Sequence, residues 1–144
     1  MTRAMHHIGL NCADPLTIER WYTKHFGFER KRVYLPSPEI PFQVVVIGNG
    51  GVAFELFPAE GDAPPRGEMD GPKQRGVRHF AFRVDDLDAK LAEMGDDAKV
   101  TLGPLDMGGF IEGMRVAWIT DPEGNTVELN QGYEDETAPP PLDS

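Results

Sequence analysis

The chain contains an internal repeat, which limits it to folds built from two copies of one unit. The segment His7-Ile-Gly-Leu-Asn-Cys-Ala-Asp14 resembles His79-Phe-Ala-Phe-Arg-Val-Asp-Asp86, 72 residues later. Further along, Val52-Ala-Phe-Glu-Leu-Phe57 resembles Asn125-Thr-Val-Glu-Leu-Asn130, which places Glu128 73 residues after Glu55. Matches that keep their register over such a distance indicate a duplicated supersecondary unit. The two modules span residues 5–57 and 78–130.

Each module shows the local signals of a strand, a helix and three further strands. In the first module, Asp14 suits a helix N-cap, Pro15 suits the first helical position and Gly27 suits the helix end. Asp86 and Gly95 bound a shorter helix in the second module. The predicted elements are a strand at 7–12, a helix at 15–26 and strands at 31–35, 44–47 and 52–57, then a strand at 79–84, a helix at 87–94 and strands at 99–102, 115–120 and 125–130. The expected fold class is α+β, with two βαβββ modules in tandem.

The remaining segments connect or extend the modules. A chain of 144 residues is long enough for one domain, so residues 1–144 are expected to form a single domain. Residues 59–76, rich in Pro and Gly, are predicted to be a connecting loop, and residues 103–113 a mobile loop. Residues 132–144 form an acidic, Pro-rich tail that is expected to be extended or disordered.

Composition excludes several classes of partner. The 24 Asp and Glu against 14 Lys and Arg give a net charge of −10, which argues against nucleic acid or an anionic membrane as the main partner. No apolar run is long enough for a membrane helix, and no signal peptide is expected at the amino terminus. The single cysteine, Cys12, excludes an intrachain disulfide and a thiolate-rich zinc site. We expect a cytoplasmic, globular protein with a small-molecule substrate.

Alternation along four predicted strands places metal-binding side chain types on the polar faces of the sheets. Successive strand residues point to opposite faces, and in each of these strands one face is apolar while a His or Glu lies on the other. If the sheets curve, these side chains can converge in a concave cup. Two imidazoles and two carboxylates suit Ni, Co, Zn, Mn or Fe(II), with one or two positions left for water or substrate. The predicted metal ligands are His7, Glu55, His79 and Glu128.

Taken singly, each of these residues has a simpler interpretation, because a lone His or Glu on a strand is usually a solvated side chain. The same residue type at the same place in both modules favours a shared role. His6 breaks the repeat and is interpreted as structural, and His25 as stabilising the end of a helix. Asn11, Arg83 and Asn130 lie on the polar faces as candidate substrate-binding residues, although a solvated surface explains them equally well.

The repeat and the stretch Asp121-Pro-Glu-Gly-Asn-Thr-Val-Glu-Leu129 resemble the vicinal oxygen chelate superfamily, and in particular its glyoxalase, bleomycin-resistance and dioxygenase branch. The likeness extends from His7-Ile-Gly-Leu10 to the last predicted strand. It implies paired βαβββ modules that each form half of a barrel-like cup, usually in a homodimer. In similar proteins, some sites are built within one chain and others are shared between two.

The resemblance also implies an activity, that of a glyoxalase I-like (lactoylglutathione lyase-like) enzyme. Glyoxalase I enzymes use His, Glu, His and Glu at the strand positions that match His7, Glu55, His79 and Glu128. The implied reaction is a metal-dependent lyase or isomerase reaction, in which the metal stabilises an enediolate of a small oxygenated substrate. Glu128 is the first candidate for the base and Glu55 the second. In glyoxalase I enzymes an Arg on the first strand commonly binds the carboxylate of glutathione, and the matching residue here is Asn11. The use of glutathione as a co-substrate is therefore left open.

Two other functions are compatible with the same residues. An Fe(II) extradiol-type dioxygenase would use His7, His79 and Glu128 alone, without a ligand at the second position. A metal-free drug-binding protein of the same fold would instead sequester a planar compound against an aromatic side chain, for which the sequence offers Trp21, Trp118 and Phe110.

Overall fold

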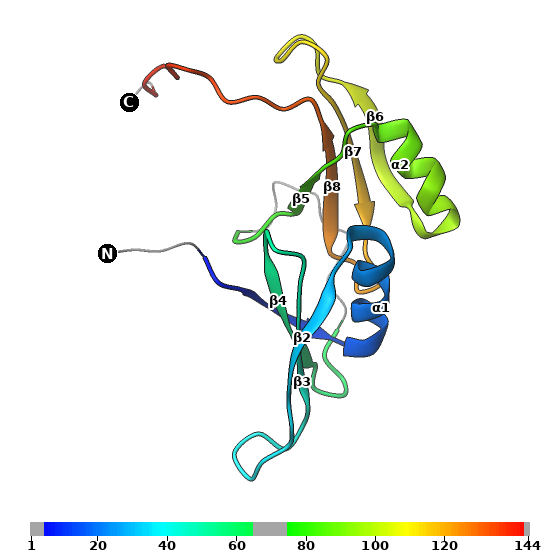
Figure 1. The fold of residues 1–144 in the computed structure, drawn as a ribbon, viewed down its shortest axis with the longest axis vertical. Coiled ribbons are helices and arrows are strands. Elements are labelled where there is room, and N and C mark those ends of the chain that lie inside the picture. Colours follow the sequence, from blue (N-terminus) through cyan, green and yellow to red (C-terminus); the bar gives the residue numbers. More distant parts are fainter. Residues whose placement is uncertain (1–4, 65–74, 143–144) are drawn as a thin grey trace. The chain divides into compact units, whose positions relative to one another are not determined.

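The computed structural model describes residues 5–64 and 75–142, and the chain groups into two compact units (Figure 1). Within the described part, unit 1 comprises residues 5–64 together with Asp121–Asn125, and unit 2 comprises residues 75–120 and 126–142. The first repeat module therefore lies in unit 1, and the second lies in unit 2 except for one turn. Residues 65–74 of the predicted connecting loop and residues 143–144 of the tail lie outside the described residues.

Unit 1 contains a four-stranded sheet and one helix. Its elements are β1 (Ile8–Cys12), α1 (Pro15–Phe26), β2 (Glu29–Tyr34), β3 (Val44–Gly48) and β4 (Ala53–Pro58). The strand order is β1-β4-β3-β2, with β1 parallel to β4 and the other pairs antiparallel. The first and last strands of the module are therefore neighbours, although 40 or more residues separate them along the chain.

Local signals fix both ends of α1. The Asp14 side chain accepts a hydrogen bond from the backbone N–H of Leu16, and Pro15 occupies the first helical position, where its missing N–H costs nothing. Gly27 ends the helix in the left-handed conformation at φ 65°, and its N–H donates to the carbonyl of Tyr22. These residues set the length of the helix whose apolar face covers the sheet.

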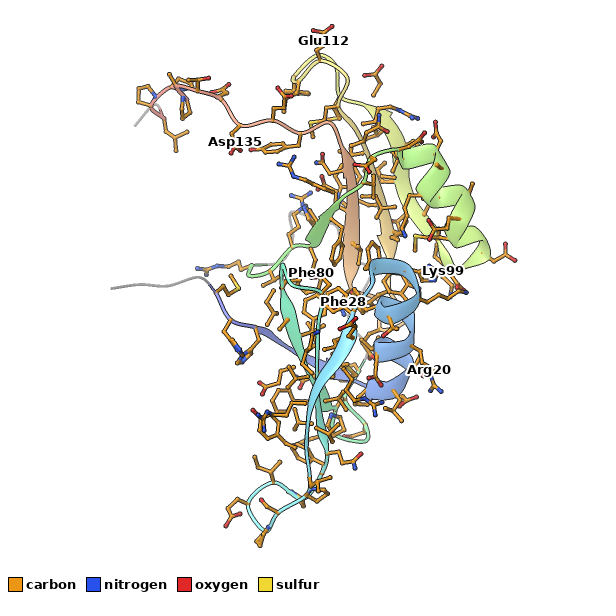
Figure 2. All side chains as sticks on the ribbon, viewed as in Figure 1. Arg20, Phe28, Phe80, Lys99, Glu112 and Asp135 are labelled. Carbon is orange, nitrogen blue, oxygen red and sulfur yellow. The ribbon has the colours of Figure 1, made fainter. Side chains whose placement is uncertain are left out.

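The core of unit 1 is aromatic. Phe28, labelled in Figure 2, stacks on Phe54 with ring centroids 5.0 Å apart, and Tyr22 meets Phe54 edge to face at the same centroid distance. All three side chains are almost completely buried. Such pairs contribute about 0.5–1.5 kcal/mol each beyond the burial of their area. The sheet face that carries Phe54 thus packs against α1, and Glu55 lies on the opposite face.

Unit 2 repeats this arrangement. Its elements are β5 (Phe80–Arg83), α2 (Leu87–Met94), the short 3-10 helix η1 (Gly95–Asp97), β6 (Lys99–Asp106), β7 (Arg115–Thr120) and β8 (Thr126–Gln131). The strand order is β5-β8-β7-β6, again with a parallel pair between the first and last strands. Helix α2 packs on β7 and β8, and its first N–H, from Leu87, donates to the side-chain oxygen of Gln131.

The structure confirms the predicted α+β fold of two tandem βαβββ modules, and both helices begin and end where predicted. The prediction of a mobile loop at residues 103–113 was wrong in its first part. Strand β6 continues to Asp106, since Leu105 pairs with Val116 and Asp106 with Arg115. The pairing is irregular between Leu102 and Leu105, and this irregularity admits the Gly-Pro sequence that had indicated a loop.

Two further expectations concern the tail and the membrane. The described part of the tail, residues 132–142, contains neither helix nor strand. None of the helices in residues 5–64 and 75–142 is long and apolar enough to span a membrane.

Candidate functional site

His7 and Glu55 are in close contact on the polar face of the unit 1 sheet. His7 directly precedes β1, and Glu55 is the third residue of β4. Nε2 of His7 lies 3.1 Å from Oε2 of Glu55. The parallel register pairs Gly9 with Glu55, and His7 shares the face of Gly9 because it is two residues away. Phe54 and Leu56, on either side of Glu55, are buried on the opposite face.

The same contact recurs in unit 2. His79 directly precedes β5, and Glu128 is the third residue of β8. Nε2 of His79 lies 2.8 Å from Oε2 of Glu128. The register pairs Ala81 with Glu128, which matches the pairing of Gly9 with Glu55. The two modules therefore hold equivalent His–Glu pairs, each built from the residue before the first strand and the third residue of the last.

Each pair brings one imidazole nitrogen and one carboxylate oxygen close together, 3.1 Å apart in unit 1 and 2.8 Å apart in unit 2. Mixed nitrogen and oxygen donors of this kind suit borderline divalent transition metals, so the donor set fits such an ion. Within either unit, the described residues bring together no group of three or more His, Cys, Asp or Glu side chains that could hold a metal. Each unit thus supplies two of the four predicted ligands.

The carboxylate of Glu128 is held from both sides. Its Oε2 faces His79, and its Oε1 accepts a 2.7 Å hydrogen bond from the side-chain amide Nδ2 of Asn130. For Glu55, the structure shows only the contact with His7 among the described residues. The side chain of Glu128 is also less exposed than that of Glu55, 11% against 19%. The two carboxylates are therefore equivalent in register and unequal in hydrogen bonding and exposure.

A tryptophan accompanies the unit 2 pair. Trp118 on β7 pairs in register with Glu128, and its ring meets that of His79 edge to face at a centroid distance of 6.3 Å. Among the described residues, Nε1 of Trp118 and Oδ1 of Asn130 are buried without a hydrogen-bond partner. Buried polar atoms usually have a partner, so these two atoms keep an unused capacity to donate (Nε1) and to accept (Oδ1) a hydrogen bond.

The other predicted substrate-binding residues have separate environments. Asn11 is exposed and lines a cavity of about 830 Å³ in unit 1. Arg83 shares the face of Asn130, with which it pairs in register. Its guanidinium donates a 3.2 Å hydrogen bond to the carbonyl of Tyr133 and lies 5.7 Å from the centre of that ring. Arg83 is thus engaged by the first residues of the tail.

The alternative stacking residues also differ in their availability. Trp21 is only 8% exposed and packs in the aromatic core of α1, so the hypothesis that it stacks on a drug is wrong. Phe110, in the loop between β6 and β7, is 83% exposed. His6 is exposed, and its Nδ1 lies 2.7 Å from Nδ1 of His7. His25 is buried against Trp21, in agreement with a structural role.

Sequence reasoning missed most of the cavity wall. Phe42 lies in the loop between β2 and β3, and Glu60 lies in the segment after β4 that had been interpreted only as a connection. Glu123 lies in the turn between β7 and β8, which unit 1 includes. None of these three residues belongs to a repeated motif, so the internal repeat gave no signal for them.

The fold and the paired contacts define a class of protein: two βαβββ modules, each with a His–Glu pair on the polar face of its sheet. The model of the Glyoxalase/Bleomycin resistance protein/Dioxygenase superfamily matches residues 4–129, and the chain belongs to this superfamily. This result confirms the resemblance inferred from the motifs.

Comparison with individual proteins gives similarities at moderate identity. The chain is 26% identical over 129 residues to the uncharacterized protein YwkD of Bacillus subtilis (strain 168), covering 90% of this chain and 97% of YwkD. It is 26% identical over 124 residues to mitochondrial methylmalonyl-CoA epimerase of Mus musculus, covering 74% of this chain and 69% of the epimerase. A solved structure of a glyoxalase I mutant from Zea mays is similar with a TM-score of 0.67 and 25% identity, covering 88% of this chain and 44% of the maize chain.

Proposed function

We propose that the protein is a metal-dependent lyase or isomerase of the glyoxalase I type, acting on a small oxygenated substrate. The observation that supports it is the recurrence of one His–Glu contact in the same register of both modules. In this proposal His7, Glu55, His79 and Glu128 together hold one Ni, Zn, Co, Mn or Fe(II) ion. Since each unit supplies two ligands, a four-ligand site requires both His–Glu pairs. The two pairs would come either from the same chain or from the two chains of a homodimer.

When bound, the ion would supply Lewis acidity, which lowers the cost of removing a proton from the carbon next to a carbonyl group. The protein's own part is to move that proton. Glu128 is the first candidate for the base and Glu55 the second, and either would take the proton from one carbon and return it to the next. The unsatisfied Trp118 Nε1 could donate to a substrate oxygen beside Glu128.

The similarities support a reaction of this type, because one relative is named an epimerase and one structural neighbour a glyoxalase I. Whether glutathione serves as co-substrate is part of the proposal to be tested. We also propose that the protein acts in the cytoplasm.

Metal content tests the site directly. The protein is purified, depleted with a chelator, reloaded separately with Ni, Co, Zn, Mn and Fe(II), and analysed by elemental mass spectrometry. We expect about one ion per set of four ligands, and its loss in both His7→Ala and His79→Ala. Loss in both variants would show that the two pairs serve one site.

A matched histidine control is available in His6→Ala. His6 contacts Nδ1 of His7 and leaves the Nε2 side to Glu55, so this variant is expected to retain the ion. Retention of the metal in His79→Ala, or no uptake of any of the five metals by the unchanged protein, would overturn the proposal. In the second case a metal-free binding protein of the same fold would become the leading hypothesis.

A dioxygenase is the second candidate function, and the unequal carboxylates favour it. Glu128 is fixed by Asn130 whereas Glu55 is not, as expected if only Glu128 were an obligatory ligand beside His7 and His79. The variant Glu55→Gln separates the two functions. Loss of exchange of substrate protons with deuterated solvent supports the lyase or isomerase, whereas retained oxygen-dependent turnover with Fe(II) supports the dioxygenase.

A further inference from the structure

Unit 1 contains a cavity of about 830 Å³ on one side of β1. Its walls come from four segments: Gly9–Ala13 of the first strand and its end, Phe42, the stretch from Phe57 to Pro64, and the turn that carries Glu123 and Asn125. Gly9 and Phe57 share the sheet face of Glu55 because they are its register partner and its second neighbour along β4. Part of the cavity wall therefore lies on the same sheet face as the His7–Glu55 pair, although neither residue of the pair lines the cavity.

The charged side chains that line this cavity are all acidic. Two aromatic rings, Phe42 and Phe57, give it an apolar part. Its charged residues are Glu60 and Glu123, and no Lys, Arg or His occurs among the lining residues that the structure describes. Asn11 adds an amide that can both donate and accept hydrogen bonds. The wall offers hydrogen-bond acceptors and negative charge, and its described residues include no cationic side chain to pair with an anion.

Glu123 has a fixed position in this wall. Its Oε2 accepts a 2.8 Å hydrogen bond from the backbone N–H of Ala13, at the point where β1 leads into α1. A carboxylate held in this way cannot turn away from an approaching ligand without losing that bond. Its carboxyl group therefore has a defined position in the cavity wall.

The thiol of Cys12 is also affected by the charge of Glu123. Burial raises the pKa of Cys12 to about 12, and Glu123, Asp121 and Asp14 add to the increase. All of these residues belong to unit 1. The charge of Glu123 therefore disfavours a further negative charge in this region of unit 1.

We propose that this cavity binds the body of an uncharged or cationic substrate with an aromatic or apolar part and a hydrogen-bond donor, and that it rejects carboxylate and phosphate groups. This inference rests on the proposed function, because the bound molecule is taken to be the substrate of that reaction. It assigns specificity to Glu60 and Glu123, with Phe42 and Phe57 as the apolar contacts. The anionic groups of a thiol cofactor or of an acyl carrier would therefore not bind in this cavity.

Three probes that share a benzyl group test the charge preference: benzylammonium, benzyl alcohol and phenylacetate. Each is titrated into the 15N-labelled full chain after chelator treatment, so that a carboxylate cannot bind to a metal. We expect benzylammonium and benzyl alcohol to shift the amide signals of Asn11, Ala13 and Gly61. The dissociation constant of phenylacetate should exceed that of benzylammonium by roughly tenfold, because two carboxylates contribute a few-fold each.

The double variant Glu60→Gln with Glu123→Gln removes both charges and keeps the size and one acceptor oxygen of each side chain. It should reduce the preference for benzylammonium to within about twofold of phenylacetate. Glu112→Gln is the matched control, because Glu112 lies in the loop between β6 and β7 of unit 2 (Figure 2) and should leave the preference unchanged.

Equal or tighter binding of phenylacetate by the unchanged protein would overturn the assignment. Shifts confined to residues outside the cavity, or no shift with any of the three probes, would overturn it as well. These outcomes are independent of metal content, so failure of this inference can be distinguished from failure of the proposed metal site.

Discussion

The hydroxyl of Tyr22 donates a 2.8 Å hydrogen bond to Oδ2 of Asp121, although the two residues lie 99 positions apart. Asp121 also accepts hydrogen bonds from the backbone N–H groups of Glu123 and Asn125 and from the side-chain amide of Asn125. Burial raises the pKa of the Asp121 carboxyl and of the Tyr22 hydroxyl. The turn that looked like a simple hairpin connection is thus anchored to α1, and it carries Glu123 to the cavity.

Replacing Tyr22 with Phe should weaken this anchor. The Asp121 carboxylate would remain buried with one donor fewer, which costs about 1–3 kcal/mol of unfolding free energy. Urea unfolding followed by circular dichroism measures this change. Tyr34→Phe is the control, because Tyr34 is 46% exposed and its loss of a hydroxyl should change stability by less than about 0.5 kcal/mol. Equal stability of the two variants would contradict the structural role of the Tyr22 hydroxyl.

Replacing Asn130 with Ala should weaken metal binding without removing a ligand. Asn130 orients the carboxylate of Glu128, and loss of such a supporting hydrogen bond typically lowers metal affinity by about 10–100-fold. Competition with a chromogenic chelator measures the affinity. Asn11→Ala, in the other unit, should keep the affinity of the unchanged protein. An unaltered affinity in Asn130→Ala would mean that the hydrogen bond does not position a metal ligand.

Cys12 should be unreactive in the folded protein. With a pKa of about 12, its thiol forms almost no thiolate at pH 8, and its side chain is only 1% exposed. We expect slow reaction with a disulfide reagent in buffer and fast reaction in denaturant. Rapid labelling of the folded protein at pH 8 would contradict this environment.

The raised pKa of Cys12 also predicts how the free energy of unfolding changes at alkaline pH. The folded-state pKa of Cys12 lies above the ordinary value of 9.0, so the unfolded chain loses the thiol proton first. The contribution of Cys12 to stability is fully present below pH 9 and is lost as the pH rises toward 12. The unfolding free energy of Cys12→Ala should therefore fall less over this window than that of the unchanged protein.

Gly132 should not tolerate a side chain. Its φ is 80°, and a Cβ atom there would lie 2.9 Å from the carbonyl oxygen of Gly113. Gly132→Ala is expected to lower the unfolding free energy by about 1–3 kcal/mol. Gly109→Ala provides a control in the same unit, since a Cβ at Gly109 meets nothing within 4 Å. Thermal unfolding of the two variants measures the difference, and similar midpoints would contradict the prediction.

Much of the fold could be predicted because its signals are local. The caps at Asp14 and Gly27 bound α1, and the alternation around Glu55 assigns each side chain to a face. Such signals act over a few residues, and the internal repeat supplied each of them twice. The irregular strand β6 was the exception, because Gly103 and Pro104 indicate a loop locally and only pairing with β7 keeps them in a strand.

The sequence by itself determined the two modules and the faces of their strands, and it predicted four residues as metal ligands. Only the tertiary structure decided that Asn130 fixes Glu128, that Tyr22 anchors the turn at Asp121, and that Glu60 and Glu123 share one cavity wall. The physical reason is that strand alternation and helix capping depend on residues that are close together in the chain. Contacts between distant segments depend instead on strand order and register, which arise when the whole unit packs.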